Sequence, residues 1–414
     1  MNWSINTEIA LTYLIARPKQ TIVAALGVTF GIGMYIFMNS LITGTNNWSE
    51  KIMLNSTPHL RIHKDNSLVT NEMMNQYLGL KHINIISNPQ FAYSDNRITN
   101  PDKLLSYLKA NPQVIAISKQ VFANVIYTHG NVAENGNLQG VNILEQDKMF
   151  DISSTMQIGR VKDLANNPNA VIIGIGLAEK LNLKVGDYLG VTAGNSVFKR
   201  LEVVGIFKTT IKAVDNAKCY TNIATIQQLL RRDRTYITDI FINIKNHTKT
   251  AYIASIIEQN TGYNVETWQQ NNEQSLAGKM IRDIIANAVV VTILLVAGFG
   301  IYNILNMVIY EKIKEIAILK ATGFQGNHVI EIFIKQAIMI GFIGSFSGAI
   351  LGYTISFMVS KIYIGVGSIT YLPVTFLIKH YIQGIIFGLL TTFFAGYIPA
   401  IRASKIDPVQ IIRG

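Results

Sequence analysis

Four long stretches of apolar residues constrain this chain more than any other feature of its sequence. The first, TIVAALGVTFGIGMYIFMNSLITG at 21–44, contains no charged residue. As an α-helix rising about 1.5 Å per residue it would be about 36 Å long, which exceeds the roughly 30 Å hydrocarbon core of a bilayer. A cleaved signal peptide would have a shorter apolar core followed by a small-residue cleavage site, and this segment does not fit that pattern. We therefore predict a membrane-spanning helix over 21–44.

Three further spans are expected after a long region in which apolar and polar residues alternate. The second covers 281–310 and holds IIANAVVVTILLVAGFGIYNILNMVIY before a group of charges that begins at Glu311. The third covers 329–360 and the fourth 381–401. Lys335 lies near one end of the third span, so its amine can reach the headgroups and avoid the roughly 2.5–3.5 kcal/mol that a charge costs at the bilayer centre.

Basic residues beside the short loops predict how these spans are oriented. They are Arg17 and Lys19 before the first span, Lys312, Lys314 and Lys320 after the second, and Arg402 and Lys405 after the fourth. Because short loops rich in Lys and Arg stay in the cytoplasm, we predict that both termini lie inside the cell. The loop 361–380, which has no charge from 365 to 376, then lies outside together with 45–280. Long domains such as this one are exempt from the charge rule.

The composition agrees with a membrane protein and excludes other classes. Hydrophobic residues make up 49% of the chain and charged residues 15%, a profile typical of a partly membrane-embedded protein. The formal charge of +11 is spread along the chain without a run of five basic residues, so we predict no binding to nucleic acid. The single cysteine, Cys219, has no internal disulfide partner and is expected to be a small buried apolar residue.

The region 45–280 has the pattern of a folded α+β domain. Its first part predicts a strand over 59–65 and a helix that begins at Pro101 and ends before the turn Asn111-Pro112. A second strand-helix-strand unit follows later, with a strand over 236–246, a helix over 248–259 and a strand over 264–268. The two units flank a β-rich middle at about 140–210. The predicted fold class is therefore an α-helical membrane protein with four transmembrane helices and a large α+β extracytoplasmic domain between the first and second.

Motifs for catalysis or nucleotide binding are missing or incomplete. Gly174 and Gly176 begin a GxGxxG pattern, but Glu179 occupies the position of the third glycine. The phosphate-binding GxxxxGK[ST] motif is absent, since Gly278-Lys279 lacks the earlier glycine, and so is HExxH. We therefore predict no catalytic residue, no metal site and no cofactor on this chain. A membrane-anchored enzyme with its site in 45–280 is the disfavoured alternative.

Several strings resemble one known superfamily. GIGLAEKLNLKVGD (174–187), VVGIF (203–207) and YTNIATIQQLL (220–230) resemble the periplasmic core domain of MacB-like permeases. EKIKEIAILKATGF (311–324) and PAIRASKIDPVQIIR (399–413) are similar to cytoplasmic segments of FtsX-type permeases. EIALTYLIARPKQT (8–21) is similar to the amphipathic lead-in of lipoprotein-releasing permeases (LolC/LolE), which predicts a cytoplasmic lead-in over 1–20.

The resemblance implies a fold and a set of partners. Permeases of this superfamily have four spans with an extracytoplasmic insert after the first, and they pair with a cytoplasmic ATP-binding cassette ATPase. ATP and Mg²⁺ are then expected on that partner. An ATPase dimer requires two permease halves, so a second permease subunit is expected, either a copy of this chain or a relative. A chain of this length without a fused ATPase is more similar to LolC/LolE than to MacB.

The segment 311–328 is the candidate site at which the ATPase acts. On a helix continuing from the second span, Ile313, Ile316, Ala317 and Lys320 form one stripe. The resemblance implies a coupling helix whose apolar face docks on the ATPase, whereas spacing alone equally fits an interfacial helix end anchored by its lysines. Gly323 suits the left-handed position that ends such a helix. The interface residues predicted here are Glu311, Lys312, Glu315, Ile316, Leu319, Lys320 and Gly323.

Small residues in the third and fourth spans predict close helix packing. They are Gly344, Gly348 and Gly352 in the third and Gly384 and Gly388 in the fourth, where a missing side chain lets helices approach in lipid. Packing within one subunit, contact with a second subunit and a surface that slides during the transport cycle all fit. Asn287, Asn303 and Asn306 in the second span are costly if they face lipid, so we expect them to face other helices.

The C-terminal tail, 402–414, leaves the membrane with basic residues at its surface. Pro399 and Pro408 bracket Arg402 and Lys405; headgroup anchoring explains these charges, and the resemblance implies that the ATPase lies nearby. The leading functional hypothesis is mechanotransmission in the bacterial inner membrane that releases lipoproteins to a periplasmic carrier. Export of a drug or peptide through an adaptor and an outer-membrane channel, as in MacB, and FtsX-like control of cell-wall hydrolases without transport are the alternatives.

Overall fold

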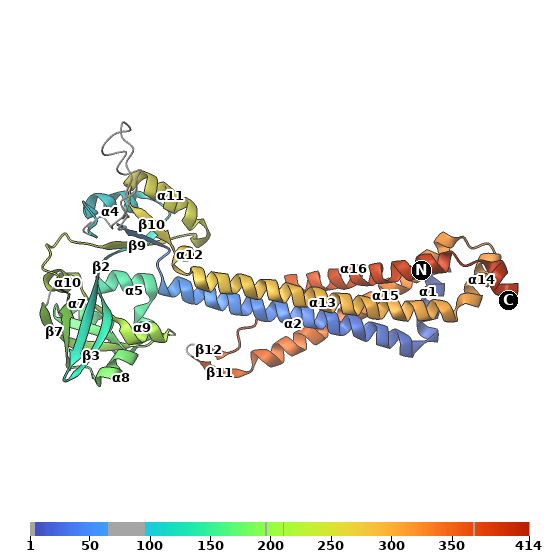
Figure 1. Cartoon of the computed structure of the whole chain (residues 1–414), viewed down its shortest axis with the longest axis horizontal. Coiled ribbons are helices and arrows are strands. Elements are labelled where there is room, and N and C mark those ends of the chain that lie inside the picture. Colours follow the sequence, from blue (N-terminus) through green and yellow to red (C-terminus); the bar gives the residue numbers. More distant parts are fainter. Residues whose placement is uncertain (1–4, 65–95, 195–196, 210, 367–368, 414) are drawn as a thin grey trace, which may run out of the picture. The chain divides into compact units, whose positions relative to one another are not determined.

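A computed structural model of the chain describes residues 5–64, 96–194, 197–209, 211–366 and 369–413. Parts of four predicted regions lie outside the described residues, namely 1–4 within 1–20, 65–95, 195–196 and 210 within 45–280, 367–368 within 361–380, and 414 within 402–414. The chain divides into two compact units: a helical unit, Met1–Ser49 with Ser275–Gly414, and an α+β unit, Glu50–Gln274. Figure 1 shows the helices of the first and the sheet of the second.

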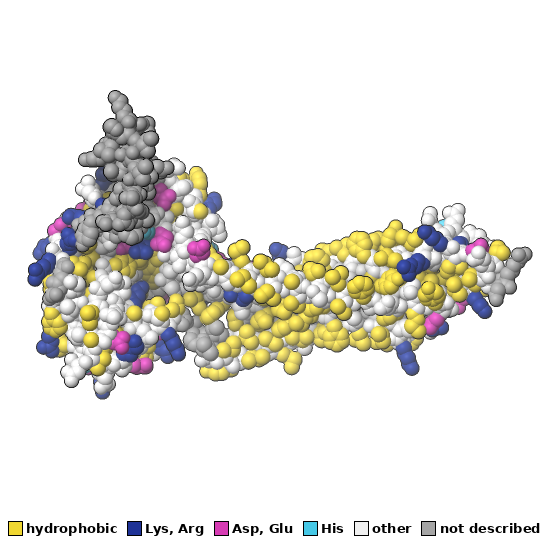
Figure 2. All heavy atoms as spheres, viewed as in Figure 1, with side chains coloured by type: hydrophobic (Ala, Val, Ile, Leu, Met, Phe, Trp, Pro, Cys, Tyr) yellow, Lys and Arg dark blue, Asp and Glu magenta, His cyan; other side chains and the backbone are white. Residues whose placement is uncertain are grey.

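Four helices among the described residues are long and apolar enough to cross a membrane. They are α2 (Pro18–Ser56), α13 (Glu273–Glu311), α15 (Gly326–Ser360) and α16 (Ile378–Ser404). Each extends beyond the span expected from hydropathy, because polar helical turns continue the apolar ones. In Figure 2 hydrophobic side chains cover this face of the helical unit along its length, while Lys and Arg gather at the end where Figure 1 shows α14 and both termini.

Shorter elements complete the helical unit. They are α1 (Ile5–Ala16), α14 (Ile313–Ala321), α17 (Pro408–Arg413) and the two-stranded β11 (Tyr363–Val366) and β12 (Ile369–Tyr371). The α14 helix ends as predicted at Gly323, whose φ is +106°. Phe324 N donates to Leu319 O at 3.1 Å and Gly323 N to Lys320 O at 3.2 Å, which is the Schellman arrangement that glycine favours.

The glycines of α15 and α16 lie at helix contacts inside one chain. A Cβ on Gly344 would lie 2.6 Å from Val28 Cβ of α2, and one on Gly352 would lie 2.9 Å from the Gly33 carbonyl oxygen. Gly384 and Gly388 face the α2 side chains Ile36 and Ile32, and Gly388 also faces Ser345 of α15. The two rows of small residues therefore let α15 and α16 approach α2 closely.

The α+β unit is built on one sheet of ten strands within the described residues. Its order is β10 (Asn264–Thr267), β1 (Leu60–His63), β9 (Asp239–Ile244), β2 (Val114–His129), β3 (Val132–Val141), β8 (Lys218–Asn222), β5 (Ala170–Gly174), β7 (Phe198–Phe207) and β4 (Met156–Gly159), with β6 (Tyr188–Ala193) pairing with β2 and β7. The two strand-helix-strand units interleave, because β1 lies between β10 and β9 in antiparallel register.

The helices of this unit cover three cores. The helix α4 (Pro101–Ala110) confirms the helix predicted to begin at Pro101. The helix α11 (Thr250–Thr261) belongs to the second strand-helix-strand unit. Both pack with β1, β9 and β10 around a core that contains Leu60, Leu108, Ile242 and Ile257. The second core gathers residues of β2, β3 and β5 to β8 with α8 (Ile175–Leu181) and α10 (Ile223–Leu229). The remaining helices are α5 (Ile143–Phe150), α6 (Ile152–Thr155), α7 (Val161–Asn166), α9 (Lys212–Ala217), the 3-10 helix His247–Lys249 and α12 (Trp268–Asn271). The third core lies under α5, α6 and α7 and contains Ile143, Leu164 and Phe207.

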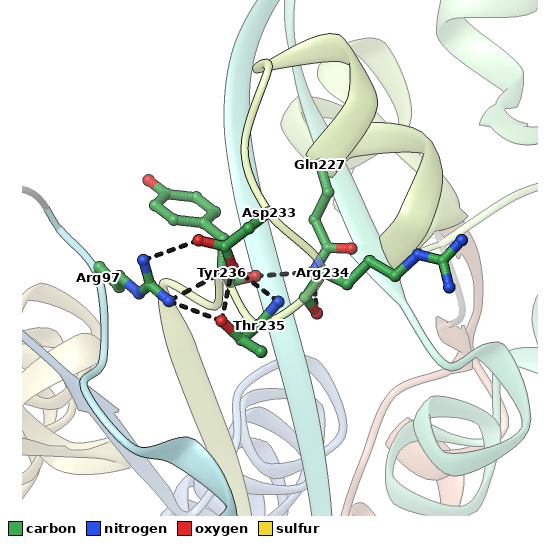
Figure 3. Close-up of polar contacts among 6 residues, drawn as sticks. All are labelled: Arg97, Gln227, Asp233, Arg234, Thr235 and Tyr236. Atoms are coloured by element: carbon green, nitrogen blue, oxygen red, sulfur yellow. Dashed lines mark hydrogen bonds and ion pairs between the residues drawn. The ribbon is translucent and has the colours of Figure 1, made fainter.

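A polar cluster fastens the loop 231–236 that leads from α10 to β9 (Figure 3). Arg97 donates to the Asp233 carboxylate at 2.8 and 3.3 Å and to Thr235 Oγ1 at 2.6 Å, and Gln227 Nε2 donates to two carbonyls of this loop at 3.0 and 2.9 Å. Hydrogen bonds from Thr235, and then Arg97, lower the pKa of Asp233. This pairing therefore persists at neutral pH and weakens only as acid protonates the carboxylate.

Cys219 lies on β8 and is fully buried, which confirms its expected role as a small core residue. Burial raises the pKa of its thiol to about 12, so the reactive thiolate is scarce at neutral pH. We expect the folded chain to resist a maleimide at pH 7.5 and to react once denatured, as measured by mass spectrometry. A Ser255→Cys variant on the exposed face of α11 is the matched control and should react in the folded state. Rapid native labelling of Cys219 itself would contradict the burial.

Candidate coupling site

The predicted coupling segment forms its own helix instead of continuing the second span. α13 ends at Glu311, Lys312 breaks the helix with φ −97° and ψ 10°, and α14 begins at Ile313. This corrects the expectation of one continuous helix. The break lets α14 take a direction of its own before the Gly323 turn leads into α15.

The inner face of α14 packs against its own chain. Ile316 and Ala317 are 1% and 0% exposed, and Ile316 shares a core with Phe333 of α15 and with Ala400 and Ala403 of α16. The prediction that Ile316 docks on an ATPase is therefore wrong, because its side chain is already covered. Periodicity correctly grouped Ile316 with Ala317, but both side chains are buried within their own chain.

Lys320 also faces inward. Its Nζ donates to Ser404 O at 2.9 Å and to Ile406 O at 2.6 Å, so a cation binds carbonyls at the C-terminal end of α16, where the helix dipole favours it. Lys320 positions α14 on α16 and is not available as a surface contact, contrary to its predicted role.

Removing this cation should loosen the C-terminal segment. Lys320→Met keeps the length of the side chain but cannot donate, and we expect a loss of about 1.5–3 kcal/mol of local stability, since hydrogen bonds from charged groups contribute that much. Hydrogen exchange of the amides in α17 should accelerate at least about tenfold. Lys314→Met, at an exposed position of α14, is the control and should leave these exchange rates unchanged. Unchanged rates in Lys320→Met as well would show that the two hydrogen bonds do not stabilise the segment.

The remaining predicted residues lie on the outer face of α14 or just before it. Lys312 Nζ lies 2.5 Å from Glu315 Oε1, and Leu319 is half-buried. Glu311 forms an ion pair with Arg17, just after α1. Ile318, which the sequence analysis did not select, is 56% exposed. It is a large apolar residue that lies outside the predicted stripe, and that position is the signal that could have identified it.

The predicted tail residues lie at the end of α16. Pro399 is buried inside the helix, Arg402 NH1 donates to Tyr302 Oη of α13 at 2.8 Å, and Lys405 is the exposed C-cap residue. Pro408 is the first residue of α17, which lies against α14. The structure thus brings the tail and the coupling segment together, although the sequence placed them 80 residues apart.

Two polar features of α13 were not predicted. Asn287 and Asn303 are exposed in the single chain, so the helices that they are predicted to face are not among the described residues of this chain. Near the other end of the helix, Asp283 accepts a hydrogen bond from Asn46 of α2 at 2.8 Å, and Arg282 donates to Asn46 Oδ1 at 3.3 Å. Polar residues that flank both spans at the same end are the signal for this second contact.

Comparison with known proteins places this site in a family. Residues 287–408 match the FtsX-like permease C-terminal family, and 21–260, more than half of the chain, match the MacB-like periplasmic core domain. The periplasmic region of MacB from Actinobacillus actinomycetemcomitans aligns with a TM-score of 0.35 and 12% identity, covering 54% of this chain and 94% of that chain.

Relatives align over nearly the whole chain. The lipoprotein-releasing system transmembrane protein LolC of Neisseria meningitidis serogroup B is 24% identical and covers 99% of both chains, and LolC of Haemophilus influenzae is 23% identical over 100% of both. The macrolide export ATP-binding/permease protein MacB of Psychrobacter cryohalolentis is 21% identical, covering 98% of this chain and 59% of that protein. The chain therefore belongs to the MacB/FtsX/LolC-LolE superfamily of ABC transporter permeases.

Proposed function

We propose that this permease works by mechanotransmission, with ATP and Mg²⁺ bound and hydrolysed on a separate ATPase dimer. The observation that carries the proposal is the division of α14 into two faces. Ile316 and Lys320 fix its inner face to α15 and α16, while Ile318 stays exposed. A force applied to the outer face would therefore move the bundle as well as α14, because packed interiors transmit displacement.

The proposed topology places both termini and 311–328 in the cytoplasm of the bacterial inner membrane. Residues 45–280 would form a periplasmic domain inserted between spans 21–44 and 281–310, with 361–380 on the same side. The length of α13 supports this layout: 39 residues extend about 58 Å as an α-helix, well beyond a roughly 30 Å hydrocarbon core. Part of α13 would then stand outside the bilayer and carry motion to the periplasmic domain.

For the cargo we propose an acylated lipoprotein, handed to a periplasmic carrier. The end-to-end alignment with two proteins named as LolC supports this choice. Export of a drug or peptide through an adaptor is the second candidate, because a MacB protein aligns with 98% of this chain. Photo-crosslinking from the α+β unit in cells separates them: recovery of lipoproteins supports release, and recovery of an adaptor or a small molecule overturns it.

A second permease subunit, identical or related, is proposed to cover the exposed side of α13. Asn303 is exposed there, and an amide group facing lipid tails would lack hydrogen-bond partners. A helix of the second subunit would supply them.

Purification of the tagged chain from its native membranes tests the coupling role. An ATP-binding cassette ATPase, identified by mass spectrometry and by ATP hydrolysis in the complex, should co-purify. Ile318→Asp and charge reversal at Glu315 should release it, because both change the outer face of α14, whereas Ser255→Asp in the α+β unit should not. Retention of the ATPase by both α14 variants would overturn the proposed site.

A further inference from the structure

A groove of about 460 Å³ lies between α1 and α14. Apolar side chains of both helices line it, among them Ile9, Ile318 and Leu319, and Glu8 and Glu315 add a carboxylate from each helix. Its volume is within the range of about 300–1,000 Å³ that is usual for ligand pockets. Neither helix forms this groove alone.

The wall formed by α1 is fixed by contacts with the rest of the helical unit. Asn6 Nδ2 donates to Glu331 Oε2 of α15 at 2.7 Å, and Lys335 Nζ donates to Thr7 Oγ1 at 2.9 Å. Ala10 and Leu14 are 0% and 6% exposed. The groove is therefore formed before any partner binds, which lowers the ordering cost of binding.

The opposite wall is joined to α1 through aromatic and charged side chains. Lys312 Nζ lies 5.2 Å from the centre of the Tyr13 ring, and it forms the ion pair with Glu315. Burial, and then the Glu315 carboxylate, raise the pKa of Tyr13 to about 12, so its hydroxyl stays protonated. One cation thus bridges both walls of the groove.

The charge of the groove indicates what it binds. Lys312 offsets Glu315, whereas the exposed Glu8 carboxylate has no ion-pair partner in the part of the chain that the structure describes. The lining therefore combines apolar surface with one uncompensated negative charge. Anionic headgroups would be repelled, while a segment that offers an apolar side chain beside Lys or Arg would be complementary.

We propose that the docking surface for the ATPase is this two-helix groove, in which α1 contributes Glu8 to receive a cation of the ATPase. The inference rests on the proposed function, because it takes the ATPase as the partner. It goes further by assigning half of the interface to the N-terminal helix. The apolar lining takes up a neighbouring apolar side chain of the same ATPase segment.

The test measures affinity of the ATPase for the full permease reconstituted in phosphatidylcholine nanodiscs. Glu8→Lys should weaken binding at least about tenfold, which corresponds to 1.4 kcal/mol. Glu8→Gln, which keeps the size of the side chain, should weaken it less and make the affinity less sensitive to salt. Lys314→Glu, a charge reversal on α14 outside the groove, is the control and should leave the affinity nearly unchanged.

The outcomes separate this inference from the proposed function. If Ile318→Asp releases the ATPase but neither Glu8 variant changes its affinity, α1 is not part of the interface and the inference is overturned alone. If the unaltered chain binds no ATPase, both fail. If Glu8→Lys acts only in nanodiscs with anionic phosphatidylglycerol and not in phosphatidylcholine, the groove faces headgroups and the inference is again overturned.

Discussion

Replacing Ile316 with aspartate is expected to disrupt the end of the helical unit that carries α14. The side chain is 1% exposed and packs with Phe333 and Ala403. An unpaired carboxylate buried among apolar groups costs about 3–5 kcal/mol, a large share of the total stability of most domains. The thermal midpoint of the purified permease in detergent should fall by several degrees, and proteases should cleave the segment 311–328 faster.

Ile318→Asp is the matched comparison, because it makes the same chemical change two residues away at a position that is 56% exposed. It should leave the midpoint almost unchanged, since surface substitutions usually stay within about 0.5 kcal/mol. If the Ile316 variant were as stable as the original chain and merely lost the ATPase, Ile316 would belong to the interface after all.

Gly348→Leu is expected to separate α15 from α2. A Cβ at this position would already lie 2.9 Å from both Ile32 Cβ and the Thr29 carbonyl oxygen of α2, and the remaining leucine atoms have no room. Overpacking of this kind costs about 1–3 kcal/mol, and here the upper end applies because backbone must move. The yield of monodisperse protein after mild heating in detergent measures the loss.

Gly27→Leu in α2 provides the control for the glycine substitution. A Cβ there meets nothing within 4 Å, and Gly within a helix is less favourable than Leu by up to about 1 kcal/mol. This variant should be as stable as the original chain or slightly more stable. Equal damage from both variants would show that the contact of α15 with α2 is not the cause.

The local elements of the fold could be predicted because their signals are local. Pro101 at the first turn and Gly323 at a left-handed position mark helix ends whatever the surroundings. The sheet order could not be predicted in the same way. β3 pairs in parallel with β8, about 80 residues later, and β1 inserts between β9 and β10. Such pairing depends on the packing of distant segments and leaves no pattern within either strand.

The sequence predicted which segment forms the candidate site, but not which contacts its individual residues make. Periodicity identified the face that Ile316 shares with Ala317, but a pattern along one helix does not say which body covers that face. The role of Lys320 depends on carbonyls 84 and 86 residues away, and the contribution of α1 depends on Asn6 meeting Glu331. An amphipathic pattern therefore predicts that one face of a helix is buried, and only the tertiary structure shows which residues cover that face.

Because Cys219 is buried, the natural chain is expected not to react with thiol-specific labels and needs no cysteine removed before a labelling site is introduced. Since the one native sulfhydryl is enclosed by the core around β8, a spin label or fluorophore added at the exposed Leu11 of α1 or Lys314 of α14 would report on its own position alone. Distances across the groove could thus be followed through an ATP cycle in a chain that differs from the natural one at the labelled positions only.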